Sequence, residues 1–241
     1  MTTTLFISDL HLCASRPRIK QLFFDFLQSA ARKADQLYIL GDFFEYWAGD
    51  DDIEDPFNRS IVSALAALTS SGVAVYLMHG NRDFLIGEAF CQASGARLLS
   101  DPSLLELNGA RTLLMHGDTL CTDDVEYQNF RKQVRDPRWQ RQFLSQPLEQ
   151  RKAIIADLRR RSETEKQMKS IDIMDVTPAS VEAALREHTY PRLIHGHTHR
   201  PALHHHQVDG KECERWVLTD WYQHGGYLRC DANGLKAIRI P

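Results

Sequence analysis

The sequence lacks the features that mark several large protein classes. Its five cysteines are scattered and none forms a CxxC pair, so neither a disulfide framework nor a thiolate zinc site is expected, and a reducing cytosol fits best. No stretch approaches the roughly 18 apolar residues of a membrane-spanning helix. The start, MTTTLFISDLHL, has no basic region and no small-residue cleavage site, which argues against a signal peptide.

Charge of one sign is not in excess either, but histidine is abundant. The chain has 29 Lys+Arg against 32 Asp+Glu, and this net charge of −3 argues against a nucleic-acid binder. Its 241 residues suffice for one large domain, or for a domain that carries an insertion. The unusual count is that of eleven histidines, several of them in tight clusters.

Short apolar runs alternate with helical patterns in the first half of the chain. Residues 5–7, 37–40 and 73–78 are predicted to be strands, and residues 17–33 and 59–71 to be helices. This alternation predicts an α/β fold with a mostly parallel sheet. Three hairpins are predicted later, over residues 104–115, 203–219 and 227–240, with turns at Asn-Gly or Asp-Gly. We therefore expect two sheets, the first mixed and the second more antiparallel, in one domain over residues 1–241.

Residues 122–170 have a different, helical and basic character. Thr122 or Asp123 is the expected helix cap, with Glu126 completing a capping box. Residues 131–169 hold 12 Lys/Arg and 5 Asp/Glu, a net charge of +7 that leaves about −10 for the rest of the chain. One interpretation is a solvated helical hairpin with its own small core. The other is a basic cap over an anionic, partly apolar substrate, resting on a membrane surface. The composition leaves both open.

Polar clusters follow five of the apolar runs. Ligands of open α/β sheets bind beyond the carboxyl ends of the strands, so these clusters are expected to meet in one crevice. Any one of these clusters alone would be interpreted as an ordinary turn, cap or core histidine. Five of them, each at the end of a predicted strand, together indicate a functional site. The clusters are Asp9-x-His11, Gly41-Asp42, Gly80-Asn81-Arg82-Asp83, His116-Gly117-Asp118 and Gly196-His197-Thr198-His199.

The donor atoms of these clusters suit a metal centre. They are carboxylates, imidazoles and one amide without a thiolate, a set that favours Mn²⁺, Fe²⁺ or Zn²⁺. Side chains two apart in an extended segment point the same way, so Asp9 and His11 could grip one ion, and His197 and His199 likewise. Seven such ligands exceed the need of one ion with an open position, but they suit two ions bridged by a carboxylate. His204-His205-His206 falls inside a predicted strand and is expected to be structural, and Cys13 and Cys121 are given no role.

These motifs resemble the calcineurin-like metallophosphoesterase superfamily, whose pattern is D-x-H, G-D, G-N-H-[DE], H and G-H-x-H. The resemblance implies a double β-sheet sandwich flanked by helices, with a two-metal site. It assigns Asp9, His11 and His199 to the first metal, and Asn81, His116 and His197 to the second, with Asp42 between them. One position departs from the pattern, because Arg82 stands where the superfamily has histidine. Arginine cannot donate a proton near neutral pH but can clamp phosphate, so we expect a phosphoanhydride substrate, whose leaving group needs no protonation.

Longer strings resemble one family within this superfamily, the bacterial UDP-2,3-diacylglucosamine hydrolases of lipid A synthesis. These strings are SDLHL, LYILGDFFEYWAGDDD, HGNRDFL, LMHGDTLCTDD, IMDV and IHGHTHRP. The resemblance covers the whole chain, including the helical cap inserted at residues 122–170. It implies cleavage of UDP-2,3-diacylglucosamine into UMP and 2,3-diacylglucosamine 1-phosphate (lipid X), with two Mn²⁺, or other divalent ions, and water entering at the α-phosphorus. It also implies an enzyme peripheral on the cytoplasmic face of the inner membrane.

The same resemblance implies a set of substrate contacts. Lys166 stands where some relatives carry Asn. His195 is either a support for the site or a satisfied core histidine. Phe43, Phe44, Tyr46 and Trp47 could flank acyl chains, but core packing is favoured for at least half of them. The implied contacts are Asn81, Arg82, Asp124, Ser162, Lys166, Lys169, His195 and His197.

Two other functions remain possible from the sequence alone. One is a metallophosphoesterase acting on a soluble substrate, such as a dinucleoside polyphosphate, a cyclic nucleotide or a phosphoprotein. Arg82 argues against a phosphoprotein, since a serine alkoxide is a poor leaving group, and the basic insertion argues against a small nucleotide. The other is a scaffold without metals, which would be expected to have lost ligands that this chain retains. Oligomeric state does not follow from the sequence.

Overall fold

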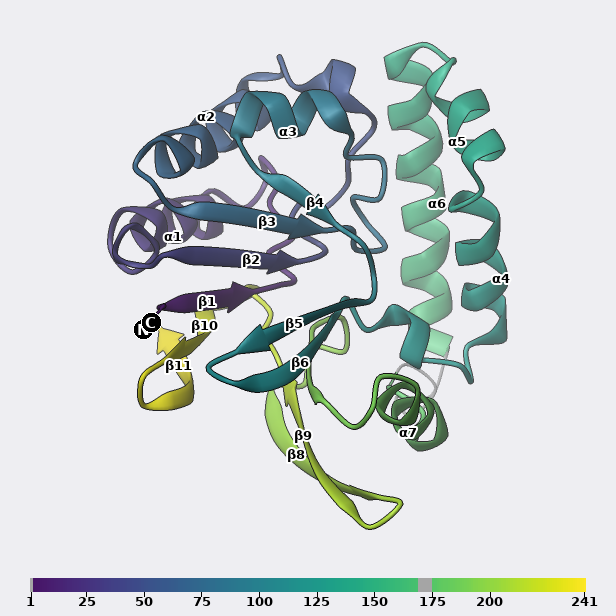
Figure 1. The fold of residues 1–241 in the computed structure, drawn as a ribbon. Coiled ribbons are helices and arrows are strands. Elements are labelled where there is room, and N and C mark those ends of the chain that lie inside the picture. The colour runs from purple at the N-terminus through teal and green to yellow at the C-terminus, as the bar shows by residue number, and fades with distance from the viewer. Residues whose placement is uncertain (1, 169–174) are drawn as a thin grey trace.

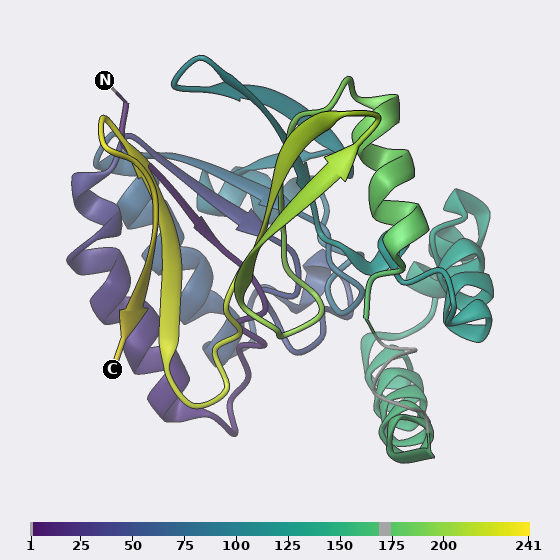
Figure 2. The ribbon, with the colours of Figure 1, turned by 90° about the horizontal axis from the view of Figure 1, so that it is seen from below.

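Two β-sheets face each other, and helices cover their outer sides. The computed structural model describes residues 2–168 and 175–241, without the side chains of residue 161 and residues 163–168. Figures 1 and 2 show the two sheets packed together, with three helices beyond residue 122 beside them. Among the described residues, no helix combines the length and apolar character needed to cross a bilayer.

The first sheet has six strands in the order β11-β10-β1-β2-β3-β4. Strands β1 to β4 run parallel, whereas β10 pairs antiparallel with β1 and with β11. The C-terminal hairpin therefore completes the first sheet. The strands are β1 (Thr4–Ile7), β2 (Gln36–Leu40), β3 (Ala74–Met78), β4 (Arg97–Leu99), β10 (Gly225–Asp231) and β11 (Gly234–Ile240).

The second sheet has five strands in the order β5-β6-β7-β9-β8. The pairs β6–β7 and β7–β9 are parallel, and the hairpins β5–β6 and β8–β9 are antiparallel. Two of the three predicted turns, Asn-Gly at 108–109 and Asp-Gly at 209–210, have positive φ at both residues, as primed turns require. In the third, at 233–234, only the glycine has positive φ. The strands are β5 (Ser103–Leu107), β6 (Ala110–Met115), β7 (Arg192–His195), β8 (Ala202–Val208) and β9 (Lys211–Val217).

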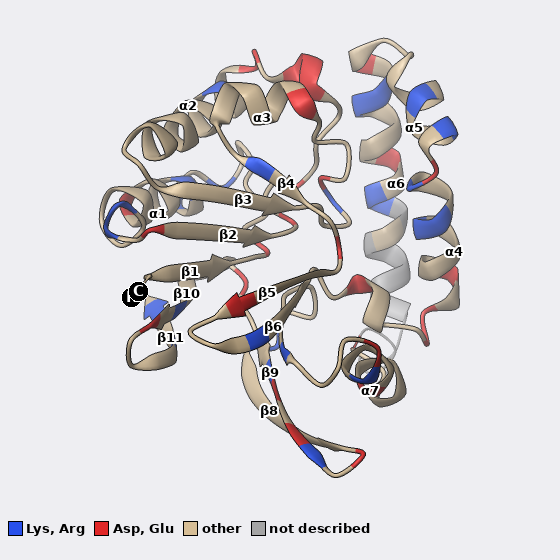
Figure 3. Cartoon of the chain, viewed as in Figure 1, with Lys and Arg blue, Asp and Glu red and all other residues tan. Residues whose placement is uncertain are grey.

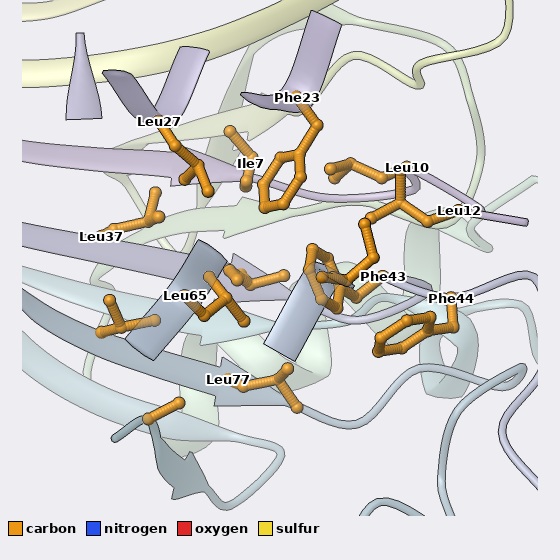
Figure 4. Close-up of a cluster of buried hydrophobic side chains, with 14 of the residues drawn as sticks. Ile7, Leu10, Leu12, Phe23, Leu27, Leu37, Phe43, Phe44, Leu65 and Leu77 are labelled. Carbon is orange, nitrogen blue, oxygen red and sulfur yellow. The ribbon is translucent and has the colours of Figure 1, made fainter. Parts of the chain in front are cut away.

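Alternation along the strands divides the core into layers. Leu5 and Ile7 of β1 pack under the helices, whereas Phe6 between them faces the second sheet. In the second sheet, Leu114 faces the first sheet and Leu113 faces α7 (Pro178–Glu187). The larger cluster, between the first sheet and its helices, is drawn in Figure 4. The double-sheet sandwich flanked by helices is thus confirmed.

Helices on the outer face of the first sheet follow the predicted pattern with shifted ends. The helix predicted over residues 17–33 ends at Gln28, and a separate 3-10 turn, Ala31–Lys33, follows. The helix predicted from residue 59 begins at Pro56, because the carboxylate of Asp55 accepts hydrogen bonds from the next backbone N–H groups. These helices are α1 (Pro17–Gln28), α2 (Pro56–Ser70) and α3 (Glu88–Ser94), with further 3-10 turns at Asp50–Asp52 and Asp118–Leu120.

Three helices occupy the segment predicted to be a helical insertion: α4 (Val125–Val134), α5 (Pro137–Leu144) and α6 (Leu148–Met168). The cap of α4 is Asp124, whose carboxylate accepts from Tyr127 N, so the predicted cap at Thr122 or Asp123 is wrong. Phe143 belongs to the large core cluster, and Trp139, Ile154 and Ile155 pack against it. Helices α5 and α6 therefore share the core of the first sheet, and the described residues form no separate small core in this segment.

The basic residues of these helices form two groups. Figure 3 shows basic residues along α4, α5 and α6. Several of them turn inward and tie α4 and α6 to the body of the protein. Arg151, only 1% exposed, donates to Asp51, to Ala48 O and to Gln146 O. Others, such as Arg138 and Arg141 on α5, face solvent. Additional inward ties are Lys152–Asp52, Arg159–Glu45, Arg131–Asp118 and Arg135–Gly80 O.

Replacing Arg151 with methionine is expected to lower the free energy of unfolding by about 2–6 kcal/mol. The substitution leaves two backbone carbonyls without their donor, and each buried unpaired group costs about 1–3 kcal/mol. The measurement is urea denaturation, with R160M as the matched control. Arg160 lies on the same helix, exposed, in an i,i+3 pair with Asp157, so its loss should change stability by less than about 0.5 kcal/mol. Equal effects of the two substitutions would contradict the inward tie.

Candidate functional site

The five polar clusters all stand where strands end, and the structure brings their side chains together. Because β1, β2 and β3 are parallel, as are β6 and β7, their carboxyl ends open on the same side. The residues are Asp9 and His11 after β1, Asp42 after β2, Asn81 and Arg82 after β3, His116 after β6, and His197 and His199 after β7.

Two groups of ligand atoms form within this cluster. Asp9, His11 and His199 make the first, and Asp42, His116 and His197 the second; within each group the ligand atoms lie within 4.8 Å of one another. Four of these six residues are buried, and the other two, His197 and His199, are partly exposed; His199 keeps 27% of its side chain exposed. Both groups have the composition of a divalent-metal site.

Asp42 lies between the two groups. Its Oδ2 is 3.8 Å from Nε2 of His11, in the first group, and its Oδ1 is 3.8 Å from Nε2 of His116, in the second. Asn81 joins the second group, because its Oδ1 is 3.1 Å from His116 Nε2 and 3.0 Å from His197 Nδ1. A carboxylate that presents one oxygen to each group has the geometry of a bridging ligand.

The backbone at the ligands is left-handed. Such a φ costs a residue with a side chain about 1–2 kcal/mol, and outliers of this kind cluster at functional sites. The prediction that His197 and His199 share one ion through an extended backbone is therefore wrong, since the turn sends them to different groups. The positive φ angles are 55° at Asp9, 48° at His11, 50° at Asp42, 69° at His197 and 54° at His199.

Two glycines let these loops approach each other. A Cβ at Gly80 would lie 2.1 Å from the backbone N of Asp42, and one at Gly196 would lie 2.3 Å from Oδ2 of Asp9. Neither distance is tolerated between non-bonded atoms. The glycines of the Gly-Asn and Gly-His motifs are thus required by close packing around the two carboxylates.

A divalent cation fits the residues present. Asp9 is fully buried, and its Oδ1 has no hydrogen-bond partner among the described residues, although it lies 3.5 Å from Nε2 of His199. Its Oδ2, in contrast, accepts from Ser8 Oγ and from His197 N. An orphaned buried carboxylate oxygen that faces imidazole nitrogens is explained by a cation between them.

The protonation of the site reflects crowded buried charges. Burial lowers the pKa of His11 to about 4, with Asp42 and Asp9 only partly offsetting it. Burial also lowers the pKa of His197 to about 4, assisted by His116. At His116 burial acts in the same direction, but the nearby carboxylates, Asp42 foremost, outweigh it and raise the pKa to about 9. The carboxylates thus draw positive charge into the site.

Hydrogen bonds from outside the cluster orient the ligands. Nδ1 of His116 donates to Leu40 O at 2.9 Å, which leaves Nε2 as the atom facing Asp42 and Asn81. Asp83, fully buried, accepts from Phe43 N and Gly80 N and so joins the loops after β2 and β3. The sequence did not single out Asp83 for this role, although it stands within the Gly-Asn-Arg-Asp string.

Arg82 is held at the cluster by its backbone. Its N–H donates to Asp42 Oδ1 at 2.8 Å, and the side chain is partly exposed. Within the described part of the chain, its guanidinium makes no hydrogen bond or ion pair. It lies close enough to His11 to lower the pKa of that imidazole. Its positive charge would therefore attract an anion bound beside the first group.

The remaining predicted substrate contacts are only partly placed. Asp124 caps α4, whose Tyr127 ring stacks near His197 with centroids 6.1 Å apart. Ser162 lies on α6, one turn after Arg159, which reaches the loop after β2 through Glu45. Lys169, like the side chain of Lys166, lies outside the described residues.

His195 is a buried histidine with both ring nitrogens engaged. Nδ1 lies 2.9 Å from Gly196 O, and Nε2 lies 3.1 Å from the Arg215 guanidinium. The carbonyl must accept and the guanidinium must donate, so the ring is neutral with its proton on Nδ1. Burial, aided by Arg215, lowers its pKa to about 3. These contacts match the second of its two predicted roles, a satisfied core histidine.

The aromatic run after β2 is mainly core. Phe43, Phe44 and Trp47 are at most 2% exposed and belong to the large cluster, whereas Tyr46 is 39% exposed. Core packing was therefore the right expectation for most of the run. His204 to His206 lie on β8, as predicted, and all five cysteines are free.

Comparisons with known proteins agree with this geometry. A family model for calcineurin-like phosphoesterases matches residues 2–201. The chain is 56% identical to the UDP-2,3-diacylglucosamine hydrolase of Aromatoleum aromaticum over 232 residues, 96% of this chain and 94% of that protein. It is 51% identical to the UDP-2,3-diacylglucosamine hydrolase of Pseudomonas paraeruginosa over 241 residues, 99% of both. The chain is therefore a hydrolase that belongs to the calcineurin-like phosphoesterase family.

Proposed function

We propose that this protein hydrolyses the pyrophosphate bond of UDP-2,3-diacylglucosamine, in lipid A synthesis, to give UMP and 2,3-diacylglucosamine 1-phosphate (lipid X). The observation that carries the hydrolytic part is the pair of ligand groups that share Asp42. The substrate is supported by the names of relatives that are 51–56% identical over nearly the whole chain.

We assign the two groups to two Mn²⁺ ions. Asp9, His11 and His199 would hold one, Asn81, His116 and His197 the other, and Asp42 would contact both. Nitrogen and oxygen donors without thiolate suit Mn²⁺, Fe²⁺ or Zn²⁺, and the choice of Mn²⁺ among them rests on the resemblance to the hydrolase family. When bound, such a pair of ions lowers the pKa of a water molecule and neutralises charge on phosphoryl oxygens.

Arg82 favours a substrate whose leaving group needs no proton. Its guanidinium can hold a phosphoryl oxygen through two parallel hydrogen bonds but cannot protonate a leaving oxygen. Water oxygen bonds to the α-phosphorus and a proton of that water passes to solvent, while the bond from the phosphorus to the bridging oxygen breaks and lipid X leaves with the electron pair as a phosphate. A phosphate leaves as an anion without a general acid, whereas an alkoxide does not.

Residues 122–170 are proposed to cover the sugar and acyl part of the substrate. Asp124, Ser162, Lys166 and Lys169 are the proposed polar contacts from this segment, with Asn81 and His197 from the metal centre. Exposed Arg138 and Arg141, together with Val125 (62% exposed) and Leu144 (40% exposed), favour peripheral attachment to the anionic cytoplasmic face of the inner membrane.

Metal content tests the ligand assignment. Metal-free protein reconstituted with Mn²⁺ should hold about two ions per chain. H199A and H116A should each hold about one, because each removes an imidazole from a different group. The measurement is elemental analysis after gel filtration, with H205A as control, since that histidine is exposed on β8. Full metal content in either of the first two variants would refute the assignment.

Isotope labelling tests the reaction. The purified protein is incubated with UDP-2,3-diacylglucosamine and Mn²⁺ in ¹⁸O-water, and the products are analysed by mass spectrometry. We expect one ¹⁸O atom in UMP, as attack at the α-phosphorus requires. Label in lipid X would place the attack at the other phosphorus, and no cleavage by Mn²⁺-loaded protein would exclude this substrate.

Vesicle binding tests the membrane attachment. Each basic residue near an anionic surface contributes about 1 kcal/mol, so R138Q/R141Q should bind phosphatidylglycerol vesicles roughly 25-fold more weakly. Hydrolysis of detergent-solubilised substrate should be unchanged, because both side chains are exposed on α5 and neither forms a hydrogen bond or ion pair with a proposed ligand among the described residues. Neutral phosphatidylcholine vesicles are the control. Equal sedimentation of both proteins with anionic vesicles would refute this use of α5.

A further inference from the structure

Glu45 occupies the junction between the metal centre and helix α6. It follows β2 by five residues and keeps 18% of its side chain exposed. Its Oε2 lies 3.3 Å from Nδ1 of His11, and its Oε1 pairs with the guanidinium of Arg159 on α6. Arg159 also donates to the backbone carbonyl of Glu45. One carboxylate thus faces a candidate metal ligand with one oxygen and α6 with the other.

The orientation of the His11 ring makes this contact significant. Its Nε2 points into the cluster, 3.3 Å from Nε2 of His199 and 3.8 Å from Asp42. Its Nδ1 points out of the cluster, is buried, and has no aligned hydrogen bond among the described residues. If Nδ1 carries the ring proton, Nε2 presents its lone pair to the metal position. A carboxylate 3.3 Å from Nδ1 favours that tautomer.

Arg16 fixes the other side of the carboxylate. Its Nη2 lies 3.6 Å from Oε2 of Glu45 and donates to the backbone carbonyls of Leu10 and His11. The two arginines and His11 together surround Glu45 with donors. A shift of α6 would therefore move the carboxylate that faces His11. None of the other ion pairs of α6 described above involves this carboxylate.

We propose that Glu45 is a positioning residue that orients His11 for the first metal. Through its pair with Arg159, it also couples the position of α6 to the binding of that metal. The proposal rests on the assignment of His11 as a ligand under the proposed function. Outer partners of ligating histidines typically contribute 10–100-fold to metal affinity. Coupling between two events is reciprocal, so metal at the first group steadies α6, and a well-seated α6 strengthens metal binding.

Mn²⁺ titration of metal-free protein tests the first half of the proposal without any substrate. Electron paramagnetic resonance separates proteins holding one ion from those holding a coupled pair. E45A should weaken the first site about 10–100-fold and leave the second within about twofold. E45Q keeps an acceptor oxygen near Nδ1 and loses the charge, so its loss should be intermediate. First-site affinity unchanged in both variants would overturn the proposal.

Hydrogen exchange of α6 amides tests the coupling. Mn²⁺ loading should slow exchange over residues 148–160 of the wild type and have no such effect in E45A. The matched control is K152Q, which breaks the 2.7 Å pair of Lys152 with Asp52 on the same helix and leaves Glu45 intact. K152Q should keep first-site affinity, which distinguishes positioning of His11 from general loosening of α6. Equal losses of affinity in K152Q and E45A would overturn the proposal.

H11A separates failure of this proposal from failure of the assignment beneath it. If H11A keeps both Mn²⁺ sites, His11 is not a ligand and the metal assignment is wrong. If H11A loses the first site while E45A retains it at full affinity, the assignment stands and the role of Glu45 is wrong.

Discussion

Two buried carboxylates, Asp9 and Asp42, constrain everything around them. Each is at most 2% exposed, and a charge in that position must be offset. One oxygen of each is held by backbone N–H donors, His197 N for Asp9 and Arg82 N for Asp42. Their other carboxylate oxygens face imidazole nitrogens. The histidines, the close glycines and the strand ends are arranged so that positive charge can be held between the carboxylates.

The same need for charge compensation explains where the basic residues go. The excess of Lys and Arg beyond residue 130 is divided: some ties α4 and α6 to acidic loops, and some stays exposed on α5. Arg131 pairs with Asp118, which is fully buried behind His116, and Lys152 pairs with Asp52. A composition count cannot separate the two uses, because they differ only in which side of a helix each residue occupies.

Local signals were sufficient for most of the strands, for two of the hairpin turns and for the set of metal-ligand candidates, but they missed β4 (Arg97–Leu99). The apolar runs near residues 5 and 37 formed strands, and polar residues followed each of them. The allocation of His197 and His199 to different groups could not be read from spacing, since it depends on left-handed φ angles. The roles of Asp83 and Glu45 depend on partners 40 and 114 residues away, and no local pattern encodes such contacts.

Left-handed backbone at five candidate ligands carries an energetic consequence. At about 1–2 kcal/mol for each residue, the strain is comparable with the whole stability of a typical domain, about 5–15 kcal/mol. It persists because the loops hold one another: Asp9 N donates to Gly41 O, His11 N to Asp42 O, and Trp221 N to Asp9 O. The ligands are therefore positioned by hydrogen bonds between loops from different strands. The site is thus a property of the assembled sheets, and no single loop could hold its ligands in this geometry alone.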